Sequence, residues 1–399
     1  MTSASESIRT GRPVTRRAAL GGGIAAATVA FAAGRARTAE AASAAPALGR
    51  LAVRGGDISF TLLEEAVGNR FYDRGVEAPV ERILANRGAS WVRLRVWVNP
   101  PAGYSDLQST LKLALRAKRA GLKTLIDPHY SDFWADPGKQ PIPASWPSDS
   151  LASVAQATRT YTRDLVRALA KQGSPADMIQ IGNEVTNGML WPWGQIYQDD
   201  GQHWADFATL VQAGVDGAQA GNPAGHQLRT MIHIDRGGDN GGTRWFFDHL
   251  FEQGIDVDVL GQSYYPMWHG SLADVQANLT DMATRYGKDI VIVETQYPWT
   301  TGNGDELANF FWNPDQLPDG DRFPPTPEGQ AGFYEALRDL LTAVPGGRGA
   351  GFLAWEPEWI PGVGWEPGAG TPNDNMTLFD WSGHSLPALG AMHAPRRTR

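Results

Sequence analysis

Cysteine is absent from the whole chain, which excludes disulfide bonds and thiolate metal sites. The stability of the fold must therefore come from packing. Positive charge is also scarce, because 35 Lys and Arg residues face 43 Asp and Glu residues, for a formal net charge of −8 and a pI near 5.5. With no overall positive field to attract a polyanion, we expect neither nucleic acid nor an anionic membrane surface as a partner.

Signals for additional modules are missing as well. Beyond the N-terminal region, no apolar run approaches the roughly 20 residues that span a membrane, and no internal repeat recurs. No linker rich in Ser, Thr and Pro leads to a second module. We therefore expect one continuous domain over residues 46–399, without a membrane span in the mature form, and a monomer.

The first 45 residues have the pattern of an export signal. Basic residues extend to Arg16 and Arg17, an apolar segment covers 18–33, and small residues follow at 39–45. This order is typical of a signal peptide, and the arginine pair resembles the twin-arginine type. We predict that residues 1–45 are a removable signal and that the mature protein is secreted and extracellular. The alternatives are a disordered tail with an accidental arginine pair, or a membrane anchor, for which the apolar run is short and rich in Gly and Ala.

Aromatic residues, by contrast, are abundant. They make up 10% of the chain and include 15 Trp. Flat apolar rings suit the C–H faces of sugars, and they are equally good core material. Composition alone leaves both interpretations open.

Short β-rich runs alternate with longer amphipathic segments from about residue 50 onward. Segments 105–120 and 151–171 have helical apolar stripes, and Gly121 and Gly173 follow them where left-handed caps are expected. The predicted strands are 56–59, 91–98, 123–128, 178–182, 230–234, 257–263, 290–294 and 351–355. Eight such units without a linker predict an α/β protein with a single (β/α)₈ TIM barrel. A doubly wound open sheet is the alternative, but no Gly-rich phosphate-binding fingerprint follows the first strand.

Two carboxylates follow predicted strands at the end where barrels carry their active sites. Glu184 ends the fourth strand and Glu294 ends the seventh, so the fold would bring them to one face. A protonated and an ionised carboxyl about 5–5.5 Å apart cleave glycosidic bonds with retention of configuration. A neighbouring carboxylate raises the pKa of one of them. We assign Glu184 as the acid/base and Glu294 as the nucleophile; for either residue alone, the alternative is a surface ion pair.

Three further residues are expected to assist this pair. Asn183 would hydrogen-bond the 2-hydroxyl of the sugar, a contact that strengthens in the transition state. Arg95 and Tyr264 would orient ionised Glu294, one through a charged fork and the other through a phenolic hydroxyl.

A metal-dependent alternative rests on residues that follow the third strand. His129, Asp132 and Asp136 are residue types that suit zinc or manganese. We expect instead that His129 donates a hydrogen bond to a sugar hydroxyl.

Five segments resemble, in order, motifs of the arabinogalactan endo-β-1,4-galactanases of glycoside hydrolase family 53. They are GDIS at 56–59, VRLRVWV at 92–98, HYSDFWADPG at 129–138, IGNEVTNGMLWP at 181–192 and ETQYPW at 294–299. The resemblance extends over residues 51–390.

This resemblance implies a retaining enzyme that cleaves internal β-1,4 bonds of galactan, such as the side chains of pectin, and needs no cofactor for catalysis. Some bacterial members are similar in carrying a structural calcium between the last two long loops. Here Asp374, within 371–376, resembles one half of that site, whereas 301–305 matches the acidic other half poorly. The resemblance also implies sugar subsites lined by Asp57, Trp97, Asp132, Trp191, Trp299 and Trp355.

Segment 300–327 departs from the family pattern. It is long and holds Phe310, Phe311 and Trp312. Long loops in a compact domain are usually functional, so we expect it to extend the cleft or alter product length, with a surface ornament as the alternative.

Two rival functions stay open. One is an endo-β-glycanase of the same barrel class acting on mannan, xylan or cellulose, against which segment 129–138 argues. The other is a carbohydrate-binding barrel without turnover, which predicts a damaged catalytic pair, whereas both glutamates are present.

Overall fold

The computed structural model describes residues 46–394, and in them eight parallel strands form a closed barrel. Its strand order is β1-β14-β13-β12-β11-β6-β5-β4. The predicted (β/α)₈ barrel is confirmed. The strands are β1 (Val53–Asp57), β4 (Trp91–Val96), β5 (Lys123–Pro128), β6 (Met178–Gln180), β11 (Arg229–Ile234), β12 (Val259–Tyr264), β13 (Asp289–Thr295) and β14 (Gly349–Ala354).

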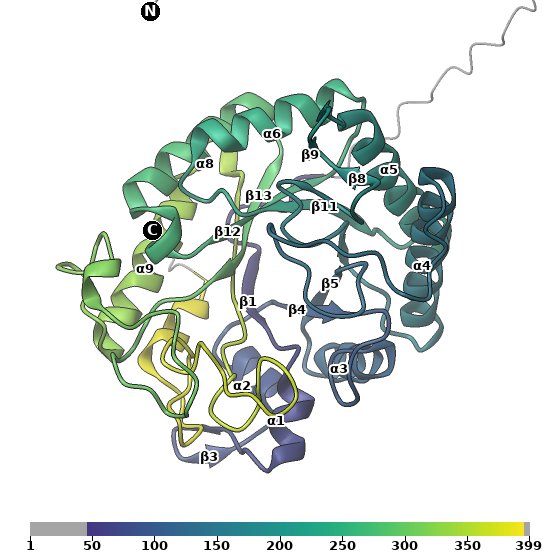
Figure 1. The fold of residues 1–399 in the computed structure, drawn as a ribbon. Coiled ribbons are helices and arrows are strands. Elements are labelled where there is room, and N and C mark those ends of the chain that lie inside the picture. The colour runs from purple at the N-terminus through teal and green to yellow at the C-terminus, as the bar shows by residue number, and fades with distance from the viewer. Residues whose placement is uncertain (1–45, 395–399) are drawn as a thin grey trace, which may run out of the picture. The chain divides into compact units, whose positions relative to one another are not determined.

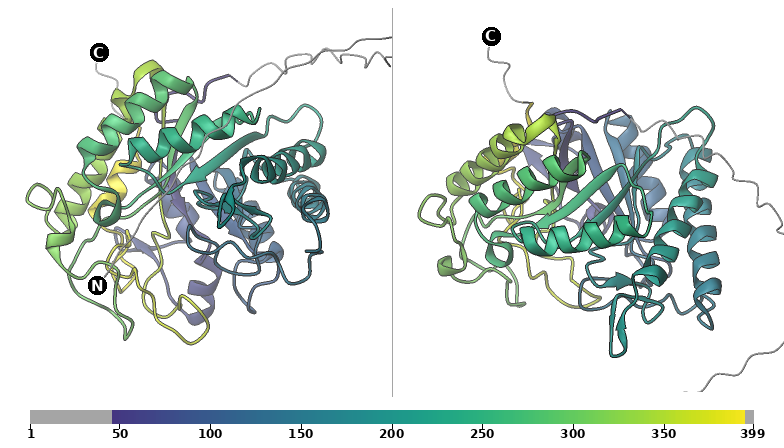
Figure 2. Two further views of the ribbon diagram at one scale, coloured as in Figure 1. Left: turned by 45° about the horizontal axis from the view of Figure 1, so that its top comes forward. Right: turned by 90° about the horizontal axis from the view of Figure 1, so that it is seen from above.

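Long helices surround this barrel (Figures 1 and 2). They are α3 (Leu107–Arg119), α4 (Leu151–Lys171), α5 (Trp204–Gly221), α6 (Asn240–Glu252), α8 (Leu272–Tyr286) and α9 (Pro327–Ala343). The shorter helices are α1 (Thr61–Val67), α2 (Val80–Asn86), α7 (Pro266–His269), η1 (Pro314–Gln316), η2 (Pro345–Gly347) and η3 (Pro387–Met392). Small hairpins pair β2 (Tyr72–Asp73) with β3 (Val76–Glu77), β7 (Gly188–Met189) with β8 (Gly194–Gln195), and β9 (Tyr197–Gln198) with β10 (Gly201–Gln202).

The two helices predicted from their apolar stripes are confirmed, and local sequence explains their ends. The Asp106 side chain caps α3 by accepting a hydrogen bond from the Ser109 amide at 2.8 Å, and Ser150 begins α4 with a capping box. Gly121 and Gly173 follow these helices with φ of 83° and 87°. This left-handed conformation favours glycine and stops each helix.

Two layers of apolar side chains hold the barrel together. The inner layer takes residues from all eight strands, whereas a larger layer lies between the strands and the helices. Successive side chains of a strand alternate between the two layers. This alternation decides which polar residues at the strand ends face the interior.

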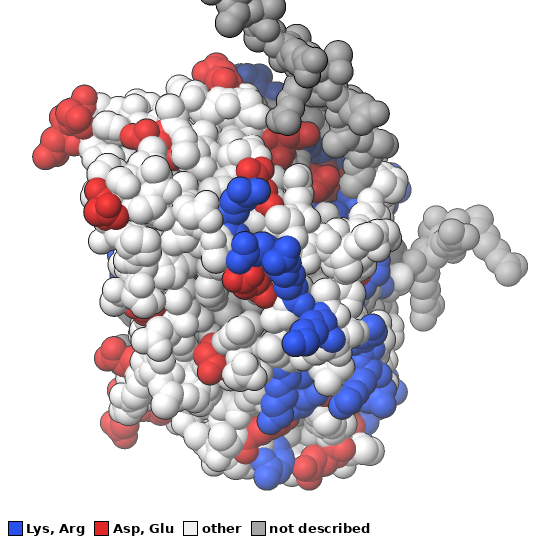
Figure 3. Space-filling model, turned by 90° about the vertical axis from the view of Figure 1, so that its right-hand side faces the viewer, with Lys and Arg blue, Asp and Glu red and all other residues white. Residues whose placement is uncertain are grey.

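Positive charge gathers on one side of the barrel despite the negative total. Figure 3 shows Lys and Arg side chains in a band across the side where α3 and α4 lie. In α4 the residues Arg159, Arg163, Arg167 and Lys171 recur every four positions, a spacing that puts them on one helix face. Their face is opposite the buried stripe, as expected for a solvated helix surface.

Three strands depart from their predicted bounds in ways that affect the site. β1 begins at Val53 and ends at Asp57, and β6 already ends at Gln180, so Glu184 stands on the following loop. β13 extends through Thr295. Among the described residues, no helix is both long and apolar enough to cross a bilayer. The predicted signal peptide, residues 1–45, lies outside the described residues.

Candidate active site

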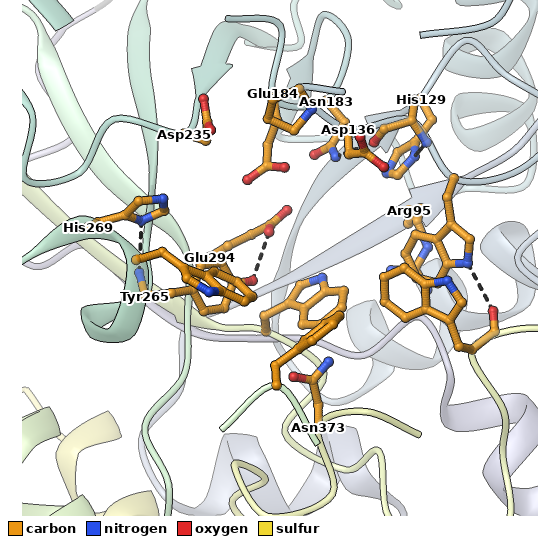
Figure 4. A pocket seen from close by; sticks show the side chains of 17 residues that line it. Arg95, His129, Asp136, Asn183, Glu184, Asp235, Tyr265, His269, Glu294 and Asn373 are labelled. Carbon is orange, nitrogen blue, oxygen red and sulfur yellow. Dashed lines mark hydrogen bonds between the residues drawn. The ribbon is translucent and has the colours of Figure 1, made fainter. Parts of the chain in front are cut away.

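A cleft with an empty volume of about 1020 Å³ opens where the barrel strands end. Its walls come from the loops after most of the strands, and both predicted catalytic residues lie in it. Figure 4 shows the Glu184 and Glu294 side chains pointing toward each other. The sequence prediction that these two carboxylates meet is confirmed.

A β-bulge in β13 turns Glu294 into this cleft. Val293 belongs to the inner layer, so strict alternation would turn the next side chain outward. The strand pairing skips a residue here, because Gln262 of β12 lies opposite Ile292 while Ser263 lies opposite Glu294. A bulge of this kind re-aims the side chain that follows it. The position of the Glu294 side chain therefore depends on one extra residue in the strand.

The backbone of Glu184 is fixed by the neighbouring strand β11. Its φ is 45°, a left-handed conformation that is uncommon for a residue other than glycine and persists only where its surroundings enforce it. The Glu184 amide approaches Nδ1 of His233 at 3.4 Å, and the Val185 amide donates to the His233 carbonyl at 2.9 Å. These contacts hold the loop after β6 against β11.

One hydroxyl group lies against both carboxylates. Ser263 Oγ is 2.6 Å from Oε1 of Glu184 and 3.5 Å from Oε2 of Glu294. The two facing oxygens are therefore no farther apart than the sum of these distances.

Arg93 and Tyr265 hold the Glu294 carboxylate. Arg93 Nη1 lies 2.7 Å from Oε1 of Glu294, and the Tyr265 hydroxyl donates to Oε2 at 2.9 Å. The same guanidinium pairs with Asp57 at 2.9 Å and with Asp127 at 2.7 Å. Glu294 thus sits beside a charge that is itself surrounded by carboxylates.

The predicted partners of Glu294 were Arg95 and Tyr264, and both assignments are wrong. Arg95 lies one inward position farther along β4, where Nη2 is 2.8 Å from Oε1 of Glu356. Its guanidinium stacks among aromatic rings, 4.6 Å from the centroid of Trp134. Tyr264 alternates to the helix side of β12, where its hydroxyl donates to the Gly270 carbonyl at 3.1 Å.

Burial raises the pKa of both catalytic carboxyls, but their neighbours differ. The negative charges of Glu294 and Asp235 raise the pKa of Glu184 further, well above its usual range. The positive charge of Arg93 and the hydrogen bond from Tyr265 oppose this rise in the pKa of Glu294. The site therefore favours a proton on Glu184 and a negative charge on Glu294, which separates an acid from a nucleophile.

The remaining predicted contact residues divide into three groups. Arg95, His129, Asn183 and Trp355 line the cleft. Asp57 and Trp97 are fully buried below it, so their assignment to sugar contacts is wrong: Asp57 holds Arg93, and the Trp97 indole donates to His129 at 3.1 Å.

Three half-buried residues lie outside the cleft lining, and their role as subsites stays a prediction. The Asp132 carboxylate accepts from the Ala144 amide at 2.8 Å. The indole N–H groups of Trp191 and Trp299 donate to the Asn187 carbonyl at 3.0 Å and to the Thr377 hydroxyl at 3.3 Å.

His129 has both ring nitrogens engaged within the protein, so the predicted bond from His129 to a sugar hydroxyl is wrong. Nδ1 accepts from Trp97 and from the Ala135 amide, and Nε2 lies 3.1 Å from Oδ2 of Asp127. Burial lowers the pKa of His129 below its ordinary value, against the opposing charge of Asp127. Asn183 retains more freedom, because one N–H of its amide donates to the Ala135 carbonyl at 2.9 Å and its other N–H is available.

The alternative metal site does not assemble. Asp136 turns to its own loop, where Oδ1 accepts from the Gly138 amide at 2.9 Å, while Asp132 and His129 are engaged as described. Across residues 46–394, no three His, Cys, Asp or Glu side chains converge to hold a metal ion.

The residues around Asp374 do not fit the calcium that the family resemblance implied. Oδ2 of Asp374 accepts from the Gly304 amide and Oδ1 from the Asn309 amide group, each at 2.7 Å. N–H donors thus stand where a cation would need free oxygens, and calcium takes six to eight oxygen ligands. Burial raises the pKa of Asp374 to about 6. The contact ties the loop after β13 to the C-terminal loop without an ion.

Sequence reasoning missed several residues that line the cleft. They are Trp134, Asp235, Tyr265, Trp268 and Trp365, whereas Phe310 lies on the long loop that was expected to extend the cleft. For Tyr265 the signal was present, because alternation from Val259 through Gly261 and Ser263 places it inward. Trp268 lies on the short helix α7 and Trp365 on a loop after β14, and no local pattern predicts the path of either segment.

A parallel barrel whose mouth holds two facing carboxylates in one aromatic cleft has the architecture of a glycoside hydrolase. Residues 53–392 match the model of glycosyl hydrolase family 53. The chain belongs to glycosyl hydrolase family 53, and it is a glycoside hydrolase.

Individual relatives agree over nearly their full lengths. An uncharacterised protein encoded in the bgaB 5′ region of Niallia circulans is 39% identical, over 86% of this chain and 93% of that protein. An arabinogalactan endo-β-1,4-galactanase of Thermothelomyces thermophilus is 35% identical, over 85% and 98%. The solved GH53 catalytic domain of Ignisphaera aggregans has a TM-score of 0.79 and 34% identity, over 85% of this chain and 95% of that one.

Replacing Tyr265 by Phe removes a hydroxyl that stabilises ionised Glu294. We expect kcat/KM to fall about tenfold to a hundredfold, the loss typical of a hydrogen bond to a charged group. Because that bond lowers the pKa of Glu294, its removal raises this pKa, and the acidic limb of the pH profile moves to higher pH. The matched control is Tyr264→Phe, which loses only the bond to Gly270. An equal shift of the limb in both variants would contradict the assignment.

Chelation tests the contact at Asp374. We expect dialysis against EDTA to change the melting temperature by less than about 1 °C, because loss of an ion destabilises only a fold that binds it. A drop of several degrees that added CaCl₂ reverses would show that an ion is bound after all.

Proposed function

We propose that this protein is a secreted endo-acting hydrolase of β-1,4-galactosidic bonds in galactan and type I arabinogalactan. The observation that carries the proposal is the facing pair Glu184 and Glu294 in the cleft of a family 53 barrel. The substrate class comes from relatives named as galactanases, among them the Thermothelomyces enzyme and an endo-β-1,4-galactanase of Bacillus subtilis that is 30% identical.

The spacing of the carboxylates supports a retaining mechanism. The Ser263 hydroxyl oxygen lies between the carboxylates, 2.6 Å from one and 3.5 Å from the other, and the sum of these distances stays below the roughly 6.5 Å at which the separation of inverting pairs begins. A water molecule placed between the carboxylates for inversion has less room than that mechanism needs.

The chemistry follows from the two charge states. Protonated Glu184 donates its proton to the glycosidic oxygen while Glu294 attacks the anomeric carbon and forms a glycosyl ester. Glu184, now ionised, then takes a proton from water as the water attacks the anomeric carbon and releases Glu294. The free N–H of Asn183 is directed to the 2-hydroxyl of the reacting sugar, and no cofactor takes part.

Aromatic rings form one side of the cleft. Trp134 and Trp365 stack with centroids 4.2 Å apart and planes at 11°. Phe310, from the long loop after β13, approaches Trp365 at 6.0 Å and Trp268 at 5.4 Å. These rings lengthen the apolar surface beyond the catalytic pair, which suits a polymer bound along the cleft and cut internally.

Secretion rests on the sequence of residues 1–45, whose basic start, apolar segment and small-residue region are typical of a twin-arginine signal. A soluble polysaccharide hydrolase outside the cell meets its substrate without transport of the polymer. The alternatives are an endo-β-glycanase for another plant polysaccharide and a binding barrel without turnover.

Activity on a panel of glycans tests the proposal. The mature wild type and its Glu184→Gln and Glu294→Gln variants are incubated with linear β-1,4-galactan, mannan, xylan and carboxymethyl cellulose, and reducing ends and product sizes are followed. We expect short galacto-oligosaccharides from galactan alone, and a loss of at least about 10³-fold in each variant. Activity on another glycan would replace the substrate class. Binding without cleavage would favour the non-catalytic barrel.

Replacing Phe310 by Ala tests the extended cleft. We expect KM for long galactan to rise about threefold to tenfold through loss of one aromatic contact, with little change in kcat. KM for a short galacto-oligosaccharide that does not reach Phe310 should stay constant. Trp312→Ala is the matched control, because that ring lies on the same loop and is 70% exposed. If the two variants behave alike, the loop does not bind the polymer.

A further inference from the structure

His233 is a buried histidine that lies behind the catalytic pair and does not line the cleft. The backbone N–H of Glu184 faces its Nδ1 atom at 3.4 Å. The Gln180 side-chain amide is 3.1 Å away, but its two N–H groups have nearer acceptors in the Asp127 carboxylate at 2.7 Å and the Gly182 carbonyl at 3.0 Å. The side-chain oxygen Oδ1 of Asn183 lies 3.2 Å from Nδ1, and this oxygen already accepts a hydrogen bond from Arg93 at 2.9 Å. Nδ1 is therefore an acceptor, and the proton of the neutral ring stands on Nε2.

Burial keeps this imidazole neutral. Complete burial lowers the pKa of His233 well below its ordinary value, and the positive charge of Arg93 adds to the effect. The ring therefore has one fixed donor, Nε2, throughout the pH range in which the enzyme would work.

The Nε2 donor directs the hydroxyl of Ser263. Nε2 lies 2.8 Å from Ser263 Oγ, so Oγ accepts from the ring and its own proton must go elsewhere. Two carboxylate oxygens are within reach, and Glu184 at 2.6 Å is much nearer than Glu294 at 3.5 Å. The hydroxyl therefore donates to Oε1 of Glu184.

We propose that His233 and Ser263 are positioning residues for the acid/base. The imidazole orients the Ser263 hydroxyl, and that hydroxyl binds Oε1 of Glu184, so that Oε2 is left to hold the proton that is transferred. As Oε2 gives its proton to the leaving oxygen, Glu184 becomes negative and the bond from Ser263 becomes charge-assisted. The bond thus strengthens while the glycosidic bond breaks, which is the condition for stabilising a transition state.

The second chemical step responds differently. When Glu184 accepts a proton from water, the negative charge that Ser263 stabilises disappears, so the same bond weakens the base. The His233–Ser263 pair therefore favours cleavage of the glycosidic bond, at the expense of hydrolysis of the glycosyl ester. Removal of the Ser263 hydroxyl should lower kcat/KM most on substrates whose leaving group needs protonation.

Other charged groups face Glu184 and set the background for a pH experiment. They are Glu294 from β13, Asp235 after β11, Arg93 from β4 and the Tyr265 hydroxyl after β12. Replacing Ser263 leaves all of them in place. Because a hydrogen bond to the ionised form lowers a carboxyl pKa, loss of the hydroxyl raises the pKa of Glu184, and the alkaline limb of kcat/KM moves to higher pH.

The test compares Ser263→Ala with the wild type on two substrates, linear galactan and an aryl β-galacto-oligosaccharide whose phenol leaves without protonation. We expect kcat/KM on galactan to fall about tenfold to a hundredfold and the alkaline limb to rise by about one pH unit. On the aryl substrate the loss should be under about threefold. Ser263→Cys, nearly the same size but a weaker donor, should shift the limb in the same direction by less.

Ser174→Ala is the matched control, because Ser174 is a buried serine that accepts from the Gln172 side chain at 2.5 Å, outside the cleft. It should lower the melting temperature without moving either limb. An unmoved limb in both Ser263 variants, or equal losses on the two substrates, would show that the hydroxyl is only structural and overturn the proposal. The inference rests on the proposed function, yet the two fail separately. An inactive wild type refutes the function. An active wild type whose Ser263 variants keep the same kcat/KM and pH limbs refutes the positioning role of His233 and Ser263.

Discussion

The buried guanidinium of Arg93 is the interaction on which the catalytic end of the barrel depends. It joins β1 through Asp57, β5 through Asp127, the loop after β6 through Asn183, and β13 through Glu294. Burial alone would lower the pKa of Arg93, but the surrounding carboxylates raise it above its ordinary value, so the charge is permanent. Removing one partner from such a cluster would leave uncompensated charge in the interior, at a cost of about 3–5 kcal/mol. The cluster therefore stabilises the fold and the ionised nucleophile through the same atoms.

A second charged layer lies just above the first and has a different role. Arg95 pairs with Glu356 at 2.8 Å and stacks on three aromatic rings. Burial raises the pKa of Glu356 and of Glu358 well above the usual carboxyl range. The Phe60 amide and the Thr61 hydroxyl donate to these two side chains, at 3.2 Å and 2.7 Å. This charged layer packs against the aromatic side of the cleft, because Arg95 contacts the rings of Phe60, Trp97 and Trp134.

The sequence predicted the parts of the molecule that depend on local pattern. Alternating strand and helix signals predicted the barrel, and positions at the ends of two strands predicted Glu184 and Glu294. Local pattern failed where side-chain direction decided the outcome. Tyr264 and Tyr265 differ only in which face of β12 they occupy, and Arg93 and Arg95 share a face but lie at different heights. The rings of Trp268, Phe310 and Trp365 meet from helix α7 and two loops far apart in sequence, and their contacts exist only in the folded chain.

The bulge in β13 has a consequence for comparing barrels by alignment. At Val293 the register between β13 and β12 shifts by one residue, because two residues of β13 lie opposite one residue of β12. An ungapped alignment would match this carboxylate to a side chain that faces the helices in a barrel without the bulge, whereas a one-residue gap at the bulge would restore the match. Equivalent nucleophiles in distant barrels should therefore be identified by superposing the strand ends, because ungapped column-by-column sequence matching assigns the wrong face of the strand.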